Sequence, residues 1–276
     1  MKKLLDYISL TRPINLFFVV LTQVLCAFYI LNLSLNWQLV LFFLGSAMIT
    51  AAGYVINDYF DIKADAVNKP KKVYVGRTIS RRQALLFVFV LNFSTIGMSF
   101  IANSTFIYTY CAITIFGLWF YSYLLKRTFL IGNIVIALLA GFSVYVLSYW
   151  GEPNNLLISF SFFAFLTNLI REIIKDSEDI KGDLLLNSKT LPIVIGVRKT
   201  KIIIIVLSIL LLIFIWIAFI KYNNWKLFAS VSVISGLLGY TIYLLLNQKN
   251  AKLSFKKGSQ ILKIIMLIGC LSIPLL

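Results

Sequence analysis

Two short stretches of this sequence contain eight of its ten acidic residues. Within each stretch three aspartates repeat the spacing D-x-x-D-x-x-x-D, and together they are Asp58, Asp61, Asp65, Asp176, Asp179 and Asp183. On a helix, offsets of three and seven residues place all three side chains within about 60° of one face. The spacing therefore predicts two matching carboxylate clusters, each on one face of a helix, as candidate catalytic groups.

Carboxylates stacked on one helix face repel each other, so both clusters predict bound cations. Oxygen ligands favour Mg²⁺ or Mn²⁺ over zinc or copper, and Mg²⁺ often shares its coordination sphere with phosphate oxygens. The sequence has no His, which removes the imidazole ligands of zinc and haem sites. The predicted ligand is a diphosphate that bridges metal ions at the two clusters. The alternative, solvated helix ends neutralised by nearby cations, is disfavoured by the repeated spacing.

Basic residues surround both clusters and could contact the phosphate groups. Arg171 and Lys175 lie one helical turn apart beside the second cluster, where they could neutralise diphosphate as it leaves. The loop after the first cluster adds Lys69, Lys72 and Arg77 as further candidates for substrate binding.

The elements that carry these residues are expected to be membrane helices. Hydrophobic residues make up 60% of the 276 residues, charged residues only 13%, and the mean hydropathy is +0.91. A soluble domain has roughly 45–50% apolar and about 25% charged residues. This chain has too few polar side chains to cover a surface in water. It is predicted to be an integral membrane protein.

A bilayer core of about 30 Å requires some 20 apolar residues per helix. Nine segments meet this requirement: 14–32, 37–56, 84–102, 106–125, 129–150, 156–170, 202–220, 227–246 and 261–276. The two acidic clusters would extend the ends of the second and sixth helices.

The distribution of positive charge predicts the orientation of these spans. If the N-terminus is cytoplasmic, 24 of the 26 Lys and Arg residues fall on the cytoplasmic side, and only Lys221 and Lys226 fall outside. Such asymmetry is typical of cytoplasmic loops. We therefore read the strong basicity as topology, with no nucleic-acid partner, and expect the C-terminus outside. No obligate protein partner is indicated.

At this point the motifs resemble those of a known family. Asn57-Asp58-x-x-Asp61-x-x-x-Asp65 is similar to the first signature of the UbiA superfamily of intramembrane prenyltransferases, and Asp179-x-x-x-Asp183 is similar to the second. The segment Thr11-Arg12-Pro13-Ile14-Asn15 also resembles the opening of that family. With nine helices in agreement, the resemblance covers essentially the whole chain, residues 1–276, as a single domain.

The resemblance implies an all-α bundle of nine transmembrane helices around a central cavity, with a cytoplasmic cap. It also implies two Mg²⁺ ions, with Mn²⁺ as a substitute, held by Asn57 and Asp61 and by Asp179 and Asp183. Arg12 and Asn15 become candidate substrate contacts through the family's opening segment. The family's tyrosine–lysine motif corresponds to Tyr121 and Lys126, here with four intervening residues instead of three. That difference leaves open whether Tyr121 or Tyr123 lines the site.

Three functions are compatible with these expectations to different degrees. The runs Asn68-Lys69-Pro70 and Arg171-Glu172-Ile173-Ile174-Lys175 resemble the branch that prenylates glycerol phosphate lipids, which implies a geranylgeranyl diphosphate donor and an ether product. In that branch Pro-x-Ser-Gly is expected where this chain has Val73-Tyr74-Val75-Gly76, so an aromatic acceptor of quinone biosynthesis stays an alternative. A cation transporter is disfavoured, because transport sites need ionisable residues near the membrane midplane.

Overall fold

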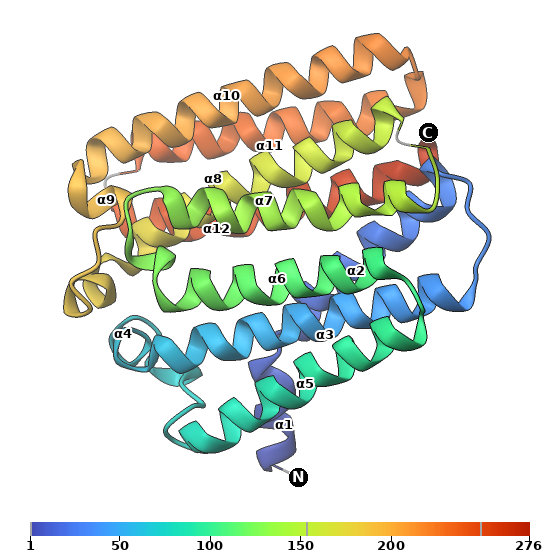
Figure 1. Ribbon diagram of the computed structural model, residues 1–276. Coiled ribbons are helices and arrows are strands. Elements are labelled where there is room, and N and C mark those ends of the chain that lie inside the picture. The colour runs from blue at the N-terminus through green and yellow to red at the C-terminus, as the bar shows by residue number, and fades with distance from the viewer. Residues whose placement is uncertain (1, 153, 249) are drawn as a thin grey trace.

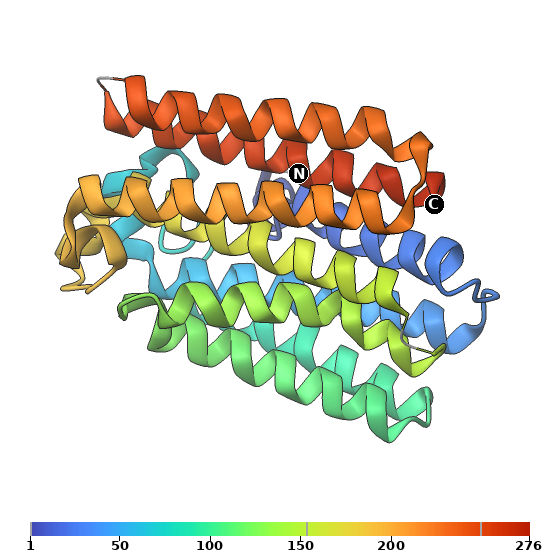
Figure 2. The ribbon, with the colours of Figure 1, turned by 90° about the horizontal axis from the view of Figure 1, so that it is seen from above.

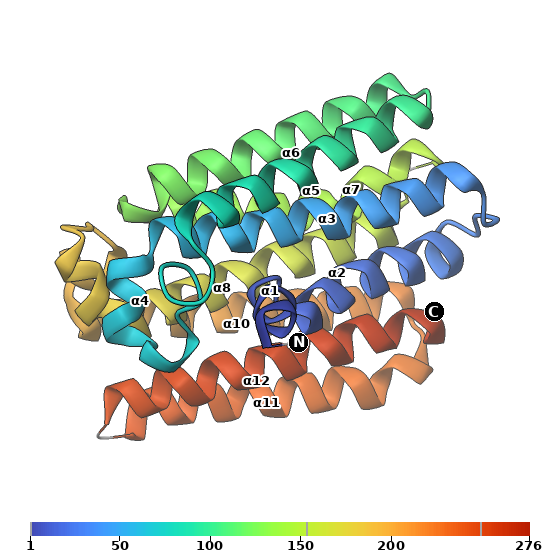
Figure 3. The ribbon, with the colours of Figure 1, turned by 90° about the horizontal axis from the view of Figure 1, so that it is seen from below.

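The computed structural model describes residues 2–152, 154–248 and 250–276, except for the side chains of Lys2 and Lys72. Within these ranges nine helices are long and apolar enough to cross a membrane, and they run side by side as one elongated bundle (Figure 1). Views from above and below show the same arrangement (Figures 2 and 3). The all-α membrane architecture predicted from the sequence is confirmed.

In the described part of the chain, the bundle consists of nine spans and three short α-helices outside them. The spans are α2 with its π-helical continuation (Pro13–Ile30), α3 (Trp37–Phe60), α5 (Arg81–Ile101), α6 (Thr105–Tyr123), α7 with a short 3-10 turn (Ile131–Tyr149), α8 (Asn155–Leu185), α10 (Gly196–Tyr222), α11 with the turn before it (Trp225–Asn247) and α12 with the turn after it (Ala251–Leu275). The other helices are α1 (Lys2–Leu10), α4 (Ile62–Asn68) and α9 (Leu191–Val194).

Each predicted span corresponds to one of these helices. Two helices extend well beyond their apolar segments: α8, as predicted from the second acidic cluster, and α12, which was not expected to. Helix α8 continues without a break from the predicted segment 156–170 to Leu185, and α12 begins at Ala251 instead of near residue 261. Charged residues lower the mean hydropathy of these extensions, yet the backbone stays helical through them. The extension of α8 carries the whole second acidic cluster.

Side-chain caps define where several spans begin. Asn36 accepts a hydrogen bond from Leu39 N at the start of α3, and Asn154 accepts one from Leu157 N at the start of α8. Ser80 forms a reciprocal capping box with Gln83 at the start of α5. These polar residues satisfy amide groups that a helix start leaves without an intrahelical partner.

The first acidic cluster is not carried on one continuous helix, which corrects the prediction. Helix α3 ends at Phe60, Asp61 has φ −94° and ψ 5°, and the chain restarts as α4 at Ile62. Helix α4 then packs against α8. In Figures 1 and 3, α4 lies at one end of the bundle and the C-terminus at the opposite end.

Candidate active site

A polar pocket lies at the end of the bundle where α4 packs on α8. It is formed by the residue before α2, the end of α3, helix α4, the segment between α6 and α7, and the C-terminal half of α8. Its lining residues are Arg12, Asn57, Asp61, Ala64, Asp65, Asn68, Lys69, Lys126, Glu172, Lys175, Asp176, Asp179 and Asp183. Ten of them were predicted as site residues, so the fold gathers most of the candidates in one place.

The second cluster lies along one face of α8, as predicted. Asp176, Asp179 and Asp183 all line the pocket. Asn133 on α7 donates a hydrogen bond of 2.7 Å to Asp176 Oδ2, and Thr190 Oγ1 lies 3.5 Å from Asp183 Oδ2. The neighbouring segments thus fix the orientation of two of the three carboxyl groups.

The break at Asp61 divides the first cluster. Asp61 and Asp65 line the pocket, whereas Asp58 lies outside the lining and forms an ion pair of 2.5 Å with Arg12. Burial on its own lowers the pKa of the Arg12 guanidinium, but the acidic groups around it, Asp58 foremost, together raise that pKa above its ordinary value. Asp58 therefore holds Arg12 at the pocket and does not line the pocket itself.

Two lysines link the clusters to other parts of the chain. Lys126 contacts Asp61 and donates a hydrogen bond of 3.0 Å to Asn57 Oδ1, while Lys69 Nζ lies 2.6 Å from Asp179 Oδ2. Burial lowers the pKa of Lys126, but the nearby carboxylates, Asp61 foremost, together raise it above its ordinary value. Burial, together with repulsion from Asp61, raises the pKa of Asp65 to about 6.

A third group of charges lies deeper along α8. Lys175 Nζ donates hydrogen bonds to both carboxylate oxygens of Glu172, at 3.0 and 2.9 Å, and Arg171 Nη1 lies 3.4 Å from Glu172 Oε1. Lys175 lines the pocket as predicted, whereas Arg171 does not. Arg171 is thus linked to the pocket by its ion pair with Glu172.

The two tyrosines differ sharply in exposure. Tyr121 is 8% exposed and lies within electrostatic range of Glu172 and Asp176, although it does not line the pocket. Tyr123 is 62% exposed, and its ring packs 5.6 Å from that of Phe60. Of the two candidates, Tyr121 is the one beside the site.

Two other predicted substrate contacts, Asn15 and Arg77, are not among the residues that line the pocket. Asn15 is partly buried on α2 but is not among the lining residues, and Arg77 is exposed and donates a hydrogen bond to the Pro70 carbonyl. The side chain of Lys72 lies outside the described residues.

Comparison with known proteins identifies the family to which this chain belongs. The profile of the UbiA prenyltransferase family matches residues 16–264, nearly the whole chain. This chain belongs to the UbiA prenyltransferase family. It is accordingly a multi-pass membrane enzyme that transfers prenyl groups, and the resemblance seen in its motifs is confirmed.

Relatives within the UbiA family match over almost their full length. The digeranylgeranylglyceryl phosphate synthase of Methanosphaera stadtmanae is 32% identical over 270 residues, which cover 96% of this chain and 97% of the relative. That of Methanobrevibacter smithii is 32% identical over 274 residues, covering 95% and 94%.

Two solved UbiA structures superpose on the whole fold. A structure of a digeranylgeranylglyceryl phosphate synthase has a TM-score of 0.74 at 28% identity and covers 99% of this chain and 98% of its own. A UbiA homolog from Archaeoglobus fulgidus bound to GPP and Mg²⁺ has a TM-score of 0.70 at 19% identity, covering 98% and 99%.

Sequence reasoning missed three residues of this UbiA-family site. Glu172 was part of the second acidic stretch, and its offsets of four and seven from Asp176 and Asp179 placed it on the same helix face. Asn68 and Asn133 gave no such signal, because their roles are hydrogen bonds to α8 from elements far away in the sequence.

The donor set fits a metal ion that is shared with a phosphate-bearing ligand. Among the described residues, no three Asp, Glu, His or Cys side chains lie close enough to hold one ion by themselves. Mg²⁺ usually binds one or two carboxylates and completes its octahedron with water and substrate phosphates. Carboxylates facing one pocket from α4 and α8 satisfy that requirement.

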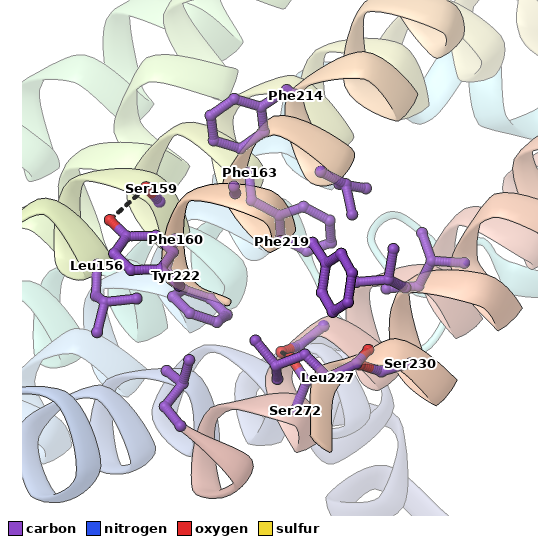
Figure 4. Close-up of a pocket in the computed structure, with 16 residues that line it drawn as sticks. Leu156, Ser159, Phe160, Phe163, Phe214, Phe219, Tyr222, Leu227, Ser230 and Ser272 are labelled. Carbon is purple, nitrogen blue, oxygen red and sulfur yellow. Dashed lines mark hydrogen bonds between the residues drawn. The ribbon is translucent and has the colours of Figure 1, made fainter. Parts of the chain in front are cut away.

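A separate apolar cavity of about 80 Å³ lies between α8, α10, α11 and α12 (Figure 4). Phe163 and Phe219 line it, and Ser159 and Tyr222 meet at its edge through a 3.5 Å hydrogen bond. At 100° per residue, Phe163 lies about 160° around α8 from Asp179. The apolar cavity and the polar pocket are therefore on opposite sides of α8.

Proposed function

We propose that this enzyme transfers a geranylgeranyl group from its diphosphate to the hydroxyl of a glycerol phosphate lipid, forming an ether. The observation that carries the proposal is the polar pocket at one end of a membrane bundle, where two sets of carboxylates and four cations meet. The relatives named as digeranylgeranylglyceryl phosphate synthases support the choice of substrates. Membrane helices would give a long isoprenoid chain an apolar environment.

In this proposal the pocket residues bind the diphosphate end of the donor. Two metal ions would be held there by Asn57, Asp61, Asp179 and Asp183. Mg²⁺ held there would neutralise the diphosphate as its bond to the allylic carbon breaks. Its use is supported by the Mg²⁺-bound homolog from Archaeoglobus fulgidus. Arg12 and Lys175 line the same pocket and would donate charge-assisted hydrogen bonds to phosphate oxygens.

The remaining steps involve the acceptor. The leaving diphosphate takes the electron pair of the broken C–O bond, and the acceptor oxygen forms the new C–O bond with the allylic carbon. The hydroxyl proton passes to a carboxylate of the pocket. The buried phenol of Tyr121, next to Glu172 and Asp176, would help to order these carboxylates around the reacting atoms. Exclusion of water protects the allylic cation from hydrolysis.

The direct test is an assay of the purified enzyme with geranylgeranyl diphosphate and competing acceptors, with products analysed by mass. A glycerol phosphate lipid and an aromatic quinone precursor are offered together. We expect the mass of the prenyl ether of the lipid. A product of the aromatic acceptor alone would contradict the proposal and leave the enzyme as a quinone-type prenyltransferase.

The basic loop after the first cluster provides a second test of the acceptor. Replacing Lys69, Lys71 and Lys72 together with Gln should raise the KM of a lipid phosphate acceptor much more than that of the prenyl donor, because lysines act as mobile point charges for phosphate. An aromatic acceptor needs no such charges. An unchanged acceptor KM in the triple variant would count against the glycerol phosphate lipid.

We further infer that the polar pocket faces the cytoplasm, with the N-terminus cytoplasmic and the C-terminus outside. The support is the placement of 24 of 26 Lys and Arg residues on one side of the nine spans. Labelling of single cysteines from outside intact cells tests the orientation. A cysteine at Lys226 should react and one at Lys71 should not, and the reverse result would invert the topology.

A further inference from the structure

Asn68 connects α4 to α8 through both ends of its side-chain amide. Its Nδ2 donates a hydrogen bond of 2.8 Å to the Asp179 carbonyl, and its Oδ1 accepts one of 3.1 Å from Gly182 N. Both partners belong to the backbone of one turn of α8. Because hydrogen bonds are directional, two of them from one short planar group fix both the distance and the rotation of α4 relative to α8.

Gly182 makes this close approach possible. A Cβ at position 182 would lie 2.3 Å from Asn68 Nδ2 and 2.7 Å from the Ala64 carbonyl oxygen, both far inside normal contact distance. Gly in a helix interior costs about 1 kcal/mol relative to Ala. The packing of α4 on α8 thus depends on the missing side chain at this position.

The contact lies between the two acidic clusters. Helix α4 begins directly after Asp61 and carries Asp65, whereas the clamped turn of α8 begins at Asp179 and ends next to Asp183. All four carboxylates line the polar pocket. The separation of the clusters is therefore set by the position of α4 on α8.

The neighbouring ion pair cannot replace this function. Lys69 Nζ lies 2.6 Å from Asp179 Oδ2, but the lysine side chain is 40% exposed and its ammonium is a mobile point charge. Such a pair tolerates many arrangements of the two helices. The amide of Asn68, by contrast, satisfies a backbone donor and a backbone acceptor in only one arrangement.

We propose that Asn68 is a positioning residue that sets the spacing between the two carboxylate clusters and hence the affinity for the metal ions that bridge them to diphosphate. The metal-binding half of this inference rests on the proposed function. The structural half, the fixed placement of α4, does not.

The test compares Asn68→Ala with Asn154→Ala. Asn154 is a matched control, because its amide also makes two hydrogen bonds to backbone, one to the Ile30 carbonyl and one from Leu157 N, at the opposite end of the same helix. Asn68→Gln is the second variant, since it keeps the amide but extends it by one methylene. It remains informative if the alanine variant does not fold.

The first measurement is the distance between spin labels on α4 and α8, which requires no substrate. Cysteines replace Val67 and Leu185, which are 48% and 59% exposed, while the native Cys26, Cys111 and Cys270 are buried. We expect a narrow distance distribution in the parent protein and in Asn154→Ala, and a broad or shifted one in Asn68→Ala and Asn68→Gln. An unchanged distribution in both Asn68 variants would overturn the positioning role.

The second measurement is the Mg²⁺ concentration at half-maximal prenyl transfer. Loss of an outer partner of a metal site typically costs 10–100-fold, so we expect an increase of about that size in the Asn68 variants, with kcat largely recovered at saturating Mg²⁺. Asn154→Ala should keep the parental value. If Asn154→Ala raised the half-maximal Mg²⁺ concentration equally, the effect of Asn68 would be one of general stability and not of positioning. If the parent enzyme showed no prenyl transfer, the proposed function would be wrong. The spin-label distances would still decide whether Asn68 positions α4.

Discussion

At the scale of single residues, the pocket carboxylates differ in the groups that they contact. Asp61 contacts Lys126, Asp179 contacts Lys69, and Asp176 accepts a hydrogen bond from the neutral amide of Asn133. Asp61 and Asp179 are the central members of the two clusters, and a divalent ion that binds them would displace the lysines that they now contact.

We expect Asp61→Ala and Asp179→Ala each to lower kcat by at least about a hundredfold. Loss of a residue that only supports a metal ligand already costs up to about that much, and these two residues are proposed as ligands themselves. Both proteins should remain folded in detergent, because removal of one acid relieves repulsion within its cluster. Steady-state prenyl transfer and size-exclusion profiles measure the two effects. Normal Mg²⁺-dependent turnover in either variant would contradict the assignment of two metal-binding clusters.

The contrast between two nearby tyrosines gives a second prediction. We expect the Tyr121 hydroxyl, which is buried within electrostatic range of Glu172 and Asp176, to donate one hydrogen bond in the occupied site. Tyr121→Phe should then lower kcat by up to about tenfold, which corresponds to the loss of about 0.5–1.5 kcal/mol. Tyr123→Phe should behave as the parent, because that side chain is exposed. Kinetics of both variants at saturating donor separate the two. Equal rates for Tyr121→Phe and the parent would exclude the phenol from the site.

At the scale of the elements, hydropathy was sufficient for the nine spans but not for their ends. The second cluster was predicted on one helix face because α8 keeps its period through the charged extension to Leu185. The same period continues through Asp58, Asp61 and Asp65, so spacing alone could not reveal the break at Asp61. The partners of these carboxylates depend on how loops fold back over the bundle, which no local pattern encodes.

Close packing of α4 on α8 leads to a third prediction. Gly182→Ala should lower thermal stability in detergent by about 1–3 kcal/mol, the usual cost of overpacking, because the added methyl meets Asn68 and the Ala64 carbonyl. Gly239→Ala on α11 is the matched control. Nothing lies within 4 Å of a Cβ at position 239, so helix propensity should make this change neutral or stabilising. Identical melting shifts in the two variants would contradict the close α4–α8 contact.

At the scale of the whole molecule, polar function is confined to one end of an otherwise apolar bundle. The carboxylates of the pocket come from the junction of α3 and α4, from α4 and from α8, while exposed apolar side chains such as Ile213 and Ile217 lie on the outer surface of α10. Such an arrangement keeps the charged end of a substrate at the pocket and leaves its hydrocarbon part to the membrane-spanning region.

A fourth prediction concerns the metal requirement of the intact enzyme. Activity should be lost on chelation and restored by Mg²⁺ or Mn²⁺, with Ca²⁺ a poor substitute. The reason is that Mg²⁺ takes a small octahedral shell of oxygens at 2.0–2.1 Å, whereas Ca²⁺ takes 6–8 ligands at longer distances. Titration of each ion into chelated enzyme measures the effect. Full activity in excess chelator would instead point to a mechanism based on Arg12, Lys126 and Lys175.

The net charge of the polar pocket couples the binding of metal ions to the binding of diphosphate. Six acidic and four basic side chains line it, so its formal charge with all groups ionised is −2. A polyanionic diphosphate alone would add to that negative charge, and metal ions alone would lack the phosphate oxygens that would otherwise complete their shells. Binding of the two should therefore be mutually reinforcing: each raises the affinity for the other by the same factor, as thermodynamic linkage requires.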